Sequence, residues 1–331
     1  MRNYRMDNIR CILIFLVVFG HMLAWIPDAD SLYRIIYLFH MPAFLFLTGY
    51  FSHFNFAKIL TQLVYPYVLF QVLYLLFDTL VFRDAPIREL VLQFTTPYWI
   101  LWYLLATTFY RLLIPLLDKA PRFVRPVVFA ASVALALLSG FVPEFGYYLS
   151  AGRFFSFLPY FLSGYYLARS KWFPTWLERP LASIQKWPLA LLGTGIALWS
   201  CLREKHFSAN MLYGSFPYEQ AHFGPEDRLM MMLFAFGWIL ALLTLVPNRH
   251  IPGISTAGGG TLPIYLLHGF LVRLMAKYHV FCFSRPVNLL FALAVSIAIV
   301  ATLGNHRVHK PLHTILTGGW VEKLWRKYVL T

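Results

Sequence analysis

The sequence predicts an all-α, polytopic integral membrane protein, and three observations support this fold class. Hydrophobic residues make up 59% of the 331 residues, only 13% are charged, and the mean hydropathy is +0.62. Soluble domains carry about 25% charged residues. Several apolar runs approach the roughly 20 residues that a helix needs to cross a bilayer. The short loops between these runs divide Lys and Arg unequally, as the loops of membrane proteins do.

Ten apolar segments are candidates for membrane-spanning helices. Some contain fewer than about 20 residues, so tilted, shortened or re-entrant segments also fit the pattern. If the N-terminus is cytoplasmic, most of the 28 Lys and Arg residues fall on the cytoplasmic side. We therefore expect both termini in the cytoplasm. The segments cover residues 9–27, 33–52, 62–82, 98–117, 126–143, 154–169, 187–202, 229–247, 262–279 and 286–304.

We expect these segments to form a single membrane-embedded domain over residues 1–331. The N-terminus lacks a small-residue cleavage site after a short apolar core, so we do not expect a cleaved signal peptide. The longest loop, 203–228, is polar and is expected to cover the outer side or to bind a partner there. The basic, amphipathic tail over about 305–331 contains Trp320 and Trp325, and we place it on the inner leaflet, against membrane lipids.

Composition and motifs exclude several function classes. The net charge of +14 is spread through short loops without a basic helix or RNA-type motif, so we expect no nucleic-acid partner. Cys11, Cys201 and Cys282 share no metal-type spacing, so we expect neither a metal nor a disulfide. The GxSxG, HExxH, EF-hand and P-loop motifs are also missing, which removes support for the usual hydrolases, proteases and ATPases.

The first span, DNIRCILIFLVVFGH, contains the strongest candidate site. Eleven positions separate Arg10 from His21, which is three turns plus about 20° and a rise of about 16 Å. The two side chains therefore share one helical stripe, and Asp7 joins it one turn earlier. Such groups are costly in lipid unless they face protein or water, so the stripe is expected to line an internal site. The alternatives are that Arg10 snorkels at the cytoplasmic boundary and that His21 bonds a neighbouring carbonyl.

Four further side chains are candidates for the site. His40 precedes Pro42, so it is either a functional group or a structural histidine at a helix kink. Trp102 fits an interfacial aromatic belt, the commoner role, or the wall of a pocket. Arg153 at the outer end of the sixth span either anchors that helix or points inward to bind an anionic or polyhydroxyl ligand. His268 lies several residues into the ninth span, after a glycine run, 258–260, that we expect to be flexible.

Several stretches resemble the acyltransferase-3 family of membrane O-acyltransferases. The first span matches that family's pattern of an arginine followed by a histidine eleven positions later. FHMPAFLFLTGYF resembles its second-helix pattern, and LWYLLA, RFFSFLPYFLSGYYLA and LPIYLLHGFLV resemble later segments. The matches cover most of the chain in the expected order. They are closest to the subgroup similar to fucose 4-O-acetylases.

The resemblance implies ten membrane helices in the bacterial cytoplasmic (inner) membrane. It also implies an acyl-CoA donor, such as acetyl-CoA, bound on the cytoplasmic side. The acceptor would be a hydroxyl of a cell-surface polysaccharide or of its lipid-linked sugar precursor. One feature departs from the family: many members carry an Arg-x-x-Arg pair before the third helix, whereas this chain has KILTQLVYPY. Only Lys58 supplies charge there, as a candidate ligand for the donor.

The chemistry of such a transfer assigns a role to each candidate. A sugar hydroxyl must lose its proton as it attacks a thioester, and an imidazole that titrates near neutral pH suits that task, which makes His21 the candidate base. Arg10 would hold a phosphate or a pantetheine carbonyl of the donor. His40 and Arg153 would orient the acceptor or stabilise the oxyanion. A covalent acyl-enzyme stays an alternative, but the one serine beside a histidine, Ser52 next to His53, lies outside the quoted motifs.

Two other functions remain compatible with the sequence. A secondary transporter or flippase would also have many helices, broken segments and buried histidines. It is less favoured because no inverted repeat is evident and acidic residues within the spans are scarce. A non-catalytic scaffold for glycan assembly is the least favoured, because the chain has no long soluble domain.

Overall fold

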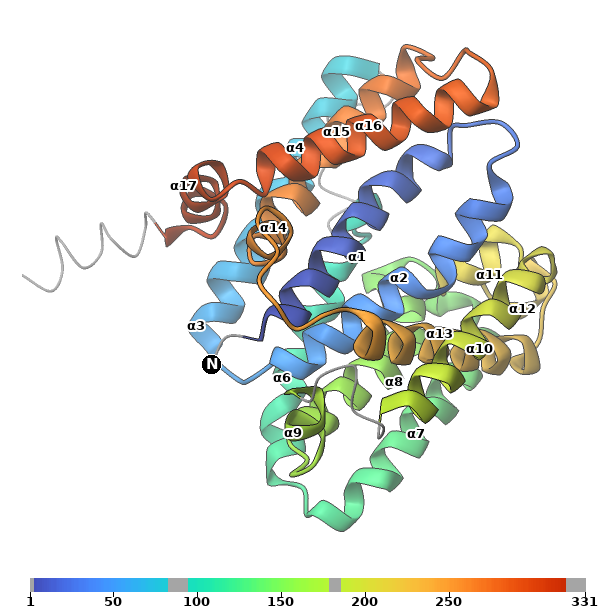
Figure 1. Cartoon of the computed structure of the whole chain (residues 1–331), viewed down its shortest axis with the longest axis vertical. Coiled ribbons are helices and arrows are strands. Elements are labelled where there is room, and N and C mark those ends of the chain that lie inside the picture. Colours follow the sequence, from blue (N-terminus) through green and yellow to red (C-terminus); the bar gives the residue numbers. More distant parts are fainter. Residues whose placement is uncertain (1–2, 83–94, 179–185, 320–331) are drawn as a thin grey trace, which may run out of the picture.

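The structure, a computed structural model, describes residues 3–82, 95–178 and 186–319. This part of the chain is helical and contains no β-strand (Figure 1). The α-helices are α1 (Tyr4–Leu23), α2 (Asp30–Phe51), α3 (Phe56–Ile59), α4 (Tyr65–Phe77), α6 (Trp102–Lys119), α7 (Arg125–Leu138), α8 (Ala151–Ala168), α9 (Phe173–Glu178), α10 (Trp187–Leu202), α11 (Ala209–Tyr213), α12 (Tyr218–Ala221), α13 (Pro225–Leu245), α14 (Ile254–Gly258), α15 (Thr261–Lys277), α16 (Arg285–Leu303) and α17 (His306–Leu316).

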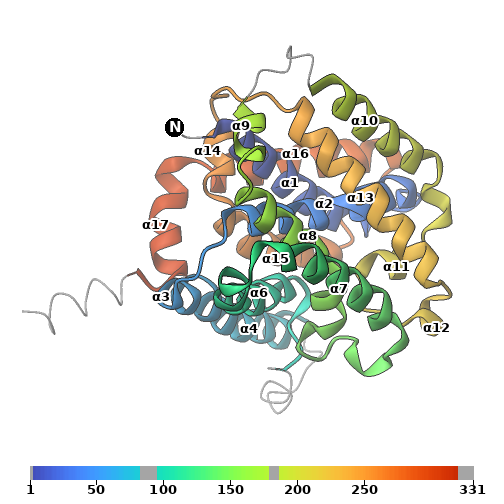
Figure 2. The ribbon, with the colours of Figure 1, turned by 90° about the horizontal axis from the view of Figure 1, so that it is seen from below.

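Helix α1 lies in the middle of the bundle, between two hydrophobic cores. Its contacts with α14, α15 and α16 lie on one flank, while α2 packs on another side (Figures 1 and 2). Ile14, Val17 and Val18 belong to the core shared with α4, α15 and α16, whereas Ile9 and Leu13 belong to the core shared with α2, α6, α8 and α13. Because α1 is enclosed in this way, its polar stripe faces protein rather than lipid.

Helices α2 and α8 cross in close contact next to α1. Gly49 of α2 lies against the carbonyl oxygen of Phe161, and Gly164 of α8 lies against the carbonyl oxygen of Phe46. A side chain at either glycine would overlap the facing backbone. Small residues allow membrane helices to approach this closely. The crossing fixes His40 of α2 relative to Arg153 of α8.

The third predicted span is a continuous helical segment, Phe56–Val81, with two wide turns. The first π-helical turn covers Leu60–Val64 and precedes Pro66, which has no N–H to donate to the preceding turn. The second covers Asp78–Phe82. Single π-turns inside α-helices are frequent at functional sites, and this one carries an acidic side chain within a membrane segment.

All ten expected spans contain a helix, and seven are long and apolar enough to cross a membrane among the described residues. The other three are α8, α10 and α15, which have 18, 16 and 17 residues. The chain is therefore a multi-helical membrane protein, as expected. Ten crossings and cytoplasmic termini stay predictions.

The polar segment 203–228 folds back over one end of the bundle through α11 and α12. Glu204 ties it to α2, because its carboxylate accepts hydrogen bonds from Ser31 at 2.9 Å and from Arg34 at 2.6 Å. At the C-terminal end, α17 is amphipathic and packs against α15 and α16 (Figure 1). Trp320 and Trp325 lie outside the described residues.

Candidate active site

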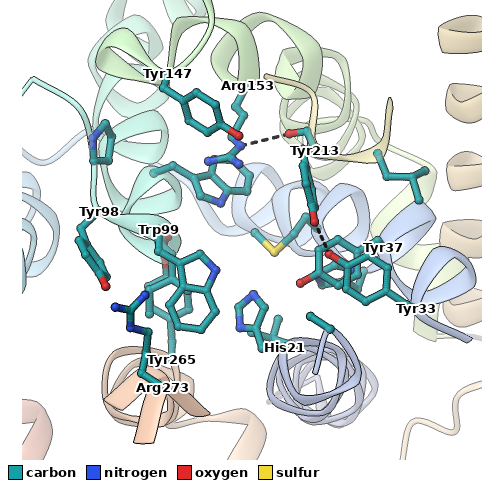
Figure 3. A pocket seen from close by; sticks show the side chains of 18 of the residues that line it. His21, Tyr33, Tyr37, Tyr98, Trp99, Tyr147, Arg153, Tyr213, Tyr265 and Arg273 are labelled. Carbon is teal, nitrogen blue, oxygen red and sulfur yellow. Dashed lines mark hydrogen bonds between the residues drawn. The ribbon is translucent and has the colours of Figure 1, made fainter. Parts of the chain in front are cut away.

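A cavity of about 460 Å³ lies at the C-terminal end of α1. We call it the His21 chamber, because His21 points into it from α1 (Figure 3). Aromatic side chains dominate its wall, and the segment 203–228 contributes to it, as expected of a cover. The polar and aromatic residues that line it are His21, Trp25, Tyr33, Tyr37, His40, Asp78, Tyr98, Trp99, Trp102, Tyr147, Arg153, Phe157, Tyr213, Tyr265 and Arg273.

A chain of hydrogen bonds fixes which nitrogen of His21 carries a proton. Nδ1 of the buried His268 lies 3.0 Å from the carbonyl oxygen of Ile264, which can only accept, so this nitrogen is protonated. In a neutral ring, Nε2 of His268 is then an acceptor. It lies 2.8 Å from Nδ1 of His21, which therefore donates. Nε2 of neutral His21 is left unprotonated, as a general base requires.

His40 combines the two roles that the sequence leaves open. Its Nδ1–H donates to the carbonyl oxygen of Ile36 at 2.7 Å, one turn earlier in α2, as expected for a structural histidine. The ring also lines the His21 chamber and packs edge-on against Tyr37, with 4.8 Å between ring centroids. In the neutral form, Nε2 of His40 is an acceptor, so it suits a hydroxyl donor better than an oxyanion.

Arg153 lies across the chamber from His21, inside an aromatic cage (Figure 3). Its guanidinium carbon is 5.2 Å from the ring centroid of Trp102 and 5.2 Å from that of Tyr147. Its Nε donates to the carbonyl oxygen of Tyr213 at 3.1 Å. Arg153 thus points inward rather than anchoring the helix at the interface. Trp102 stacks on Phe157 in the chamber wall and is 8% exposed, so it is not part of a lipid-facing belt.

Asp78 and Arg273, which are not among the site residues expected from the sequence, form an ion pair in the chamber wall. Arg273 of α15 donates to Asp78 at 2.7 Å, and Tyr98 donates to the other oxygen of the same carboxylate at 2.5 Å. Asp78 is the one carboxylate among the described residues that line the chamber. A signal was present, because opposite charges within two spans tend to pair.

A second cavity of about 300 Å³ lies toward the N-terminal end of α1. We call it the Arg10 chamber. Its lining includes two glycines, Gly259 and Gly260, and the polar residues Arg10, Thr48, Gln62, Tyr103, Thr107, Arg111, Thr261, Tyr265 and His313. Arg10 is 3.4 Å from Asp7 and 4.0 Å from the ring centroid of Phe51. Burial, followed by the nearby His309, lowers the pKa of His313, so this ring is largely neutral at pH 7.

The two chambers share a wall. Val17, Met41 and Tyr265 line both cavities. Arg10 and His21 sit on opposite sides of this wall, on the stripe of α1 predicted from the sequence, about 16 Å apart along its axis. A long, thin ligand that passes the shared wall would reach His21 from the Arg10 chamber.

Comparison with known proteins identifies the family. Residues 3–304 match the family model described as an acyltransferase domain. The chain belongs to the acyltransferase-3 family. It is therefore a membrane acyltransferase, as the motifs in the sequence indicate. No curated protein and no solved structure matches it.

Five of the seven expected site residues of this acyltransferase line one of the two chambers. His21, His40, Trp102 and Arg153 line the His21 chamber, and Arg10 lines the other. His268 touches His21 from behind and is 1% exposed, so it contacts His21 rather than the cavity. Lys58 is exposed in α3 and lines neither chamber. The glycine run is not a loose loop, because Gly258 packs against the backbone of Asp7.

Proposed function

We propose that this acyltransferase moves an acetyl group from acetyl-CoA to a hydroxyl of a cell-surface polysaccharide or its lipid-linked sugar precursor, in the bacterial cytoplasmic membrane. One observation carries the proposal: the unprotonated Nε2 of His21 belongs to a ring that points into an aromatic-walled cavity. A base so placed suits deprotonation of an alcohol during attack on a thioester. The resemblance to the fucose 4-O-acetylase-like subgroup supports a sugar as the acceptor.

The proposed reaction uses residues of the two chambers and His268 behind His21. The acceptor hydroxyl attacks the thioester carbonyl while its proton passes to Nε2 of His21. The tetrahedral intermediate then collapses and expels the CoA thiolate, which recovers that proton as a thiol. Nδ1–H of His21 stays bonded to His268 throughout, so the imidazolium formed in between keeps an acceptor for its second proton.

The walls of the His21 chamber suit a sugar. Trp99, Trp102 and Tyr147 offer flat apolar faces, while His40 offers an acceptor and Arg153 offers donors for hydroxyl groups. We propose that Arg153 binds the acceptor or the oxyanion and that His40 accepts a hydrogen bond from a sugar hydroxyl. The donor would enter from the cytoplasm through the Arg10 chamber, and its thioester would reach His21 past the shared wall.

Mass spectrometry of surface glycans from cells with and without the intact protein tests this function. We expect O-acetyl groups to disappear from one sugar when the protein is absent. Purified protein in vesicles should transfer labelled acetyl from acetyl-CoA to that glycan. Uptake of a glycan precursor into vesicles without acetyl-CoA, together with unchanged glycan acetylation, would instead support the transporter or flippase alternative.

A further inference from the structure

The Arg10 chamber has an excess of positive charge. Two guanidinium groups, from Arg10 and Arg111, line it, and no carboxylate does so among the described residues. Asp7 contacts Arg10 at 3.4 Å but does not line the cavity. A cavity with two cations and no facing acid is suited to an anionic ligand, because each guanidinium presents donors only.

Of the two guanidinium groups, that of Arg111 has fewer partners within the protein than that of Arg10. It lies in the middle of α6, inside a predicted membrane span, and the described part of the chain offers it no ion pair. Its Nε is enclosed and has no hydrogen-bond partner. Arginine within a membrane segment is costly unless it faces a cavity or a partner, and it often marks a substrate path. Because Arg111 also lines the chamber, its guanidinium is placed to bind a ligand that the protein itself does not supply.

The start of α15 also favours an anion in the Arg10 chamber. Gly259, Gly260 and Thr261 line the chamber, and no side chain caps the helix there. The first N–H groups of a helix lack partners within it, and its dipole favours an anion at that end. Gly258 brings this helix start next to α1, because a side chain at that position would overlap the carbonyl oxygen of Asp7.

We propose that Arg111, together with Arg10 and the start of α15, binds the phosphate groups of the acyl donor. The ligand class is an elongated thioester with a phosphate-bearing head and an uncharged arm, as in acyl-CoA. The head occupies the Arg10 chamber, and the arm passes the wall shared with the His21 chamber. This inference rests on the proposed function, and it places the donor's charge on α6 rather than at Lys58.

The test measures ligand binding to the full-length protein in nanodiscs of neutral lipid. Affinities are compared for CoA, 3′-dephospho-CoA and pantetheine, which lacks phosphate. We expect the wild-type affinity to fall roughly tenfold or more from CoA to pantetheine. Arg111→Met should weaken CoA binding by roughly tenfold, leave pantetheine binding unchanged, and be partly rescued by Arg111→Lys. Lys119→Met removes an exposed charge from the same helix and should bind CoA as the wild type does.

Three outcomes overturn the proposal. One is equal wild-type affinity for CoA and pantetheine, which requires no variant to fold. Another is an Arg111→Met protein that is folded, judged by its thermal melting, yet retains wild-type CoA affinity. The third is loss of the phosphate dependence when phosphatidylglycerol is added to the nanodisc, which would assign the chamber to a lipid headgroup. Phosphate-dependent CoA binding without acetyl transfer would refute the proposed function and leave this inference standing.

Discussion

Nδ1 of His21 lies 2.8 Å from Nε2 of His268, and the planes of the two rings differ by only 4°. His268 in turn is held by the carbonyl oxygen of Ile264, one turn earlier in α15. The pair joins the first and ninth predicted spans and leaves the other nitrogen of His21 for the cavity. The buried imidazole of His268 thus holds His21 in one orientation and one tautomer, as orienting partners do for functional histidines in other proteins.

Replacing His268, which accepts the hydrogen bond from His21, should slow the reaction without weakening substrate binding. His268→Leu leaves Nδ1–H of His21 without a partner, so the ring loses its fixed tautomer and orientation. We expect kcat to fall roughly 10–100-fold, with little change in KM for donor or acceptor. His268→Gln can accept the hydrogen bond through its amide oxygen and should recover part of the rate. Steady-state kinetics showing equal losses in the two variants would argue against an orienting role.

Replacing Arg153 should affect the acceptor and not the donor. Arg153→Lys keeps a charge but loses the planar guanidinium that sits between Trp102 and Tyr147. If Arg153 binds the acceptor, we expect its KM to rise roughly tenfold while KM for acetyl-CoA stays unchanged. Kinetics with each substrate varied in turn provide the measurement. A fall in kcat alone would assign Arg153 to the oxyanion instead.

The crossing of α2 and α8 should not tolerate a methyl group. Gly164→Ala would push a carbon into the carbonyl oxygen of Phe46, so the helices must separate. We expect a loss of roughly 1–3 kcal/mol in the free energy of unfolding and a lower melting temperature. Gly195→Ala in α10 is the matched control, because the added carbon meets no atom within 4 Å. Equal melting temperatures for the two variants would contradict the packing described here.

The hydrogen bonds of Glu204 that attach the segment 203–228 to α2 should weaken at acid pH. Burial of Glu204 opposes its ionisation, but hydrogen bonds from Arg34 and Ser31 outweigh it and lower the pKa. The stabilisation is therefore complete above the unfolded value of about 4.3 and is lost as the pH falls through the lower folded value. Glu204→Gln should cost on the order of 1 kcal/mol at pH 7.

Thermal melting of the wild type and of Glu204→Gln over a pH series checks this prediction. The two melting temperatures should differ at neutral pH and converge as the pH drops below about 4. A difference that stays constant across the series would show that Glu204 contributes by packing rather than by charge.

The sequence predicted those features that depend on one helix at a time. The spacing of Arg10 and His21 alone placed both on one stripe, and hydrophobic runs located every described long helix. Features that depend on which helices become neighbours were not predictable in this way. The tautomer of His21 is set by His268, which lies 247 positions away in the chain. Whether Trp102 faces lipid or a cavity likewise depends on α8, which packs over it.

Charged residues within the predicted spans mark the two chambers. Arg111 and Arg273 both fall inside predicted spans, and each lines a chamber. The length of a segment cannot tell which partner such a residue will meet. Lys58 shows the converse, because its place in the chain, where many family members carry an arginine pair, does not put its side chain in either chamber.

The most direct test of the central proposal is the rate of acetyl transfer from acetyl-CoA by His21→Ala, at the same level of folded protein as the wild type. A general base contributes roughly 10²–10⁴-fold, so we expect glycan O-acetylation to fall by at least about 100-fold. Acetylation at the wild-type rate would contradict the assignment of His21 as the base.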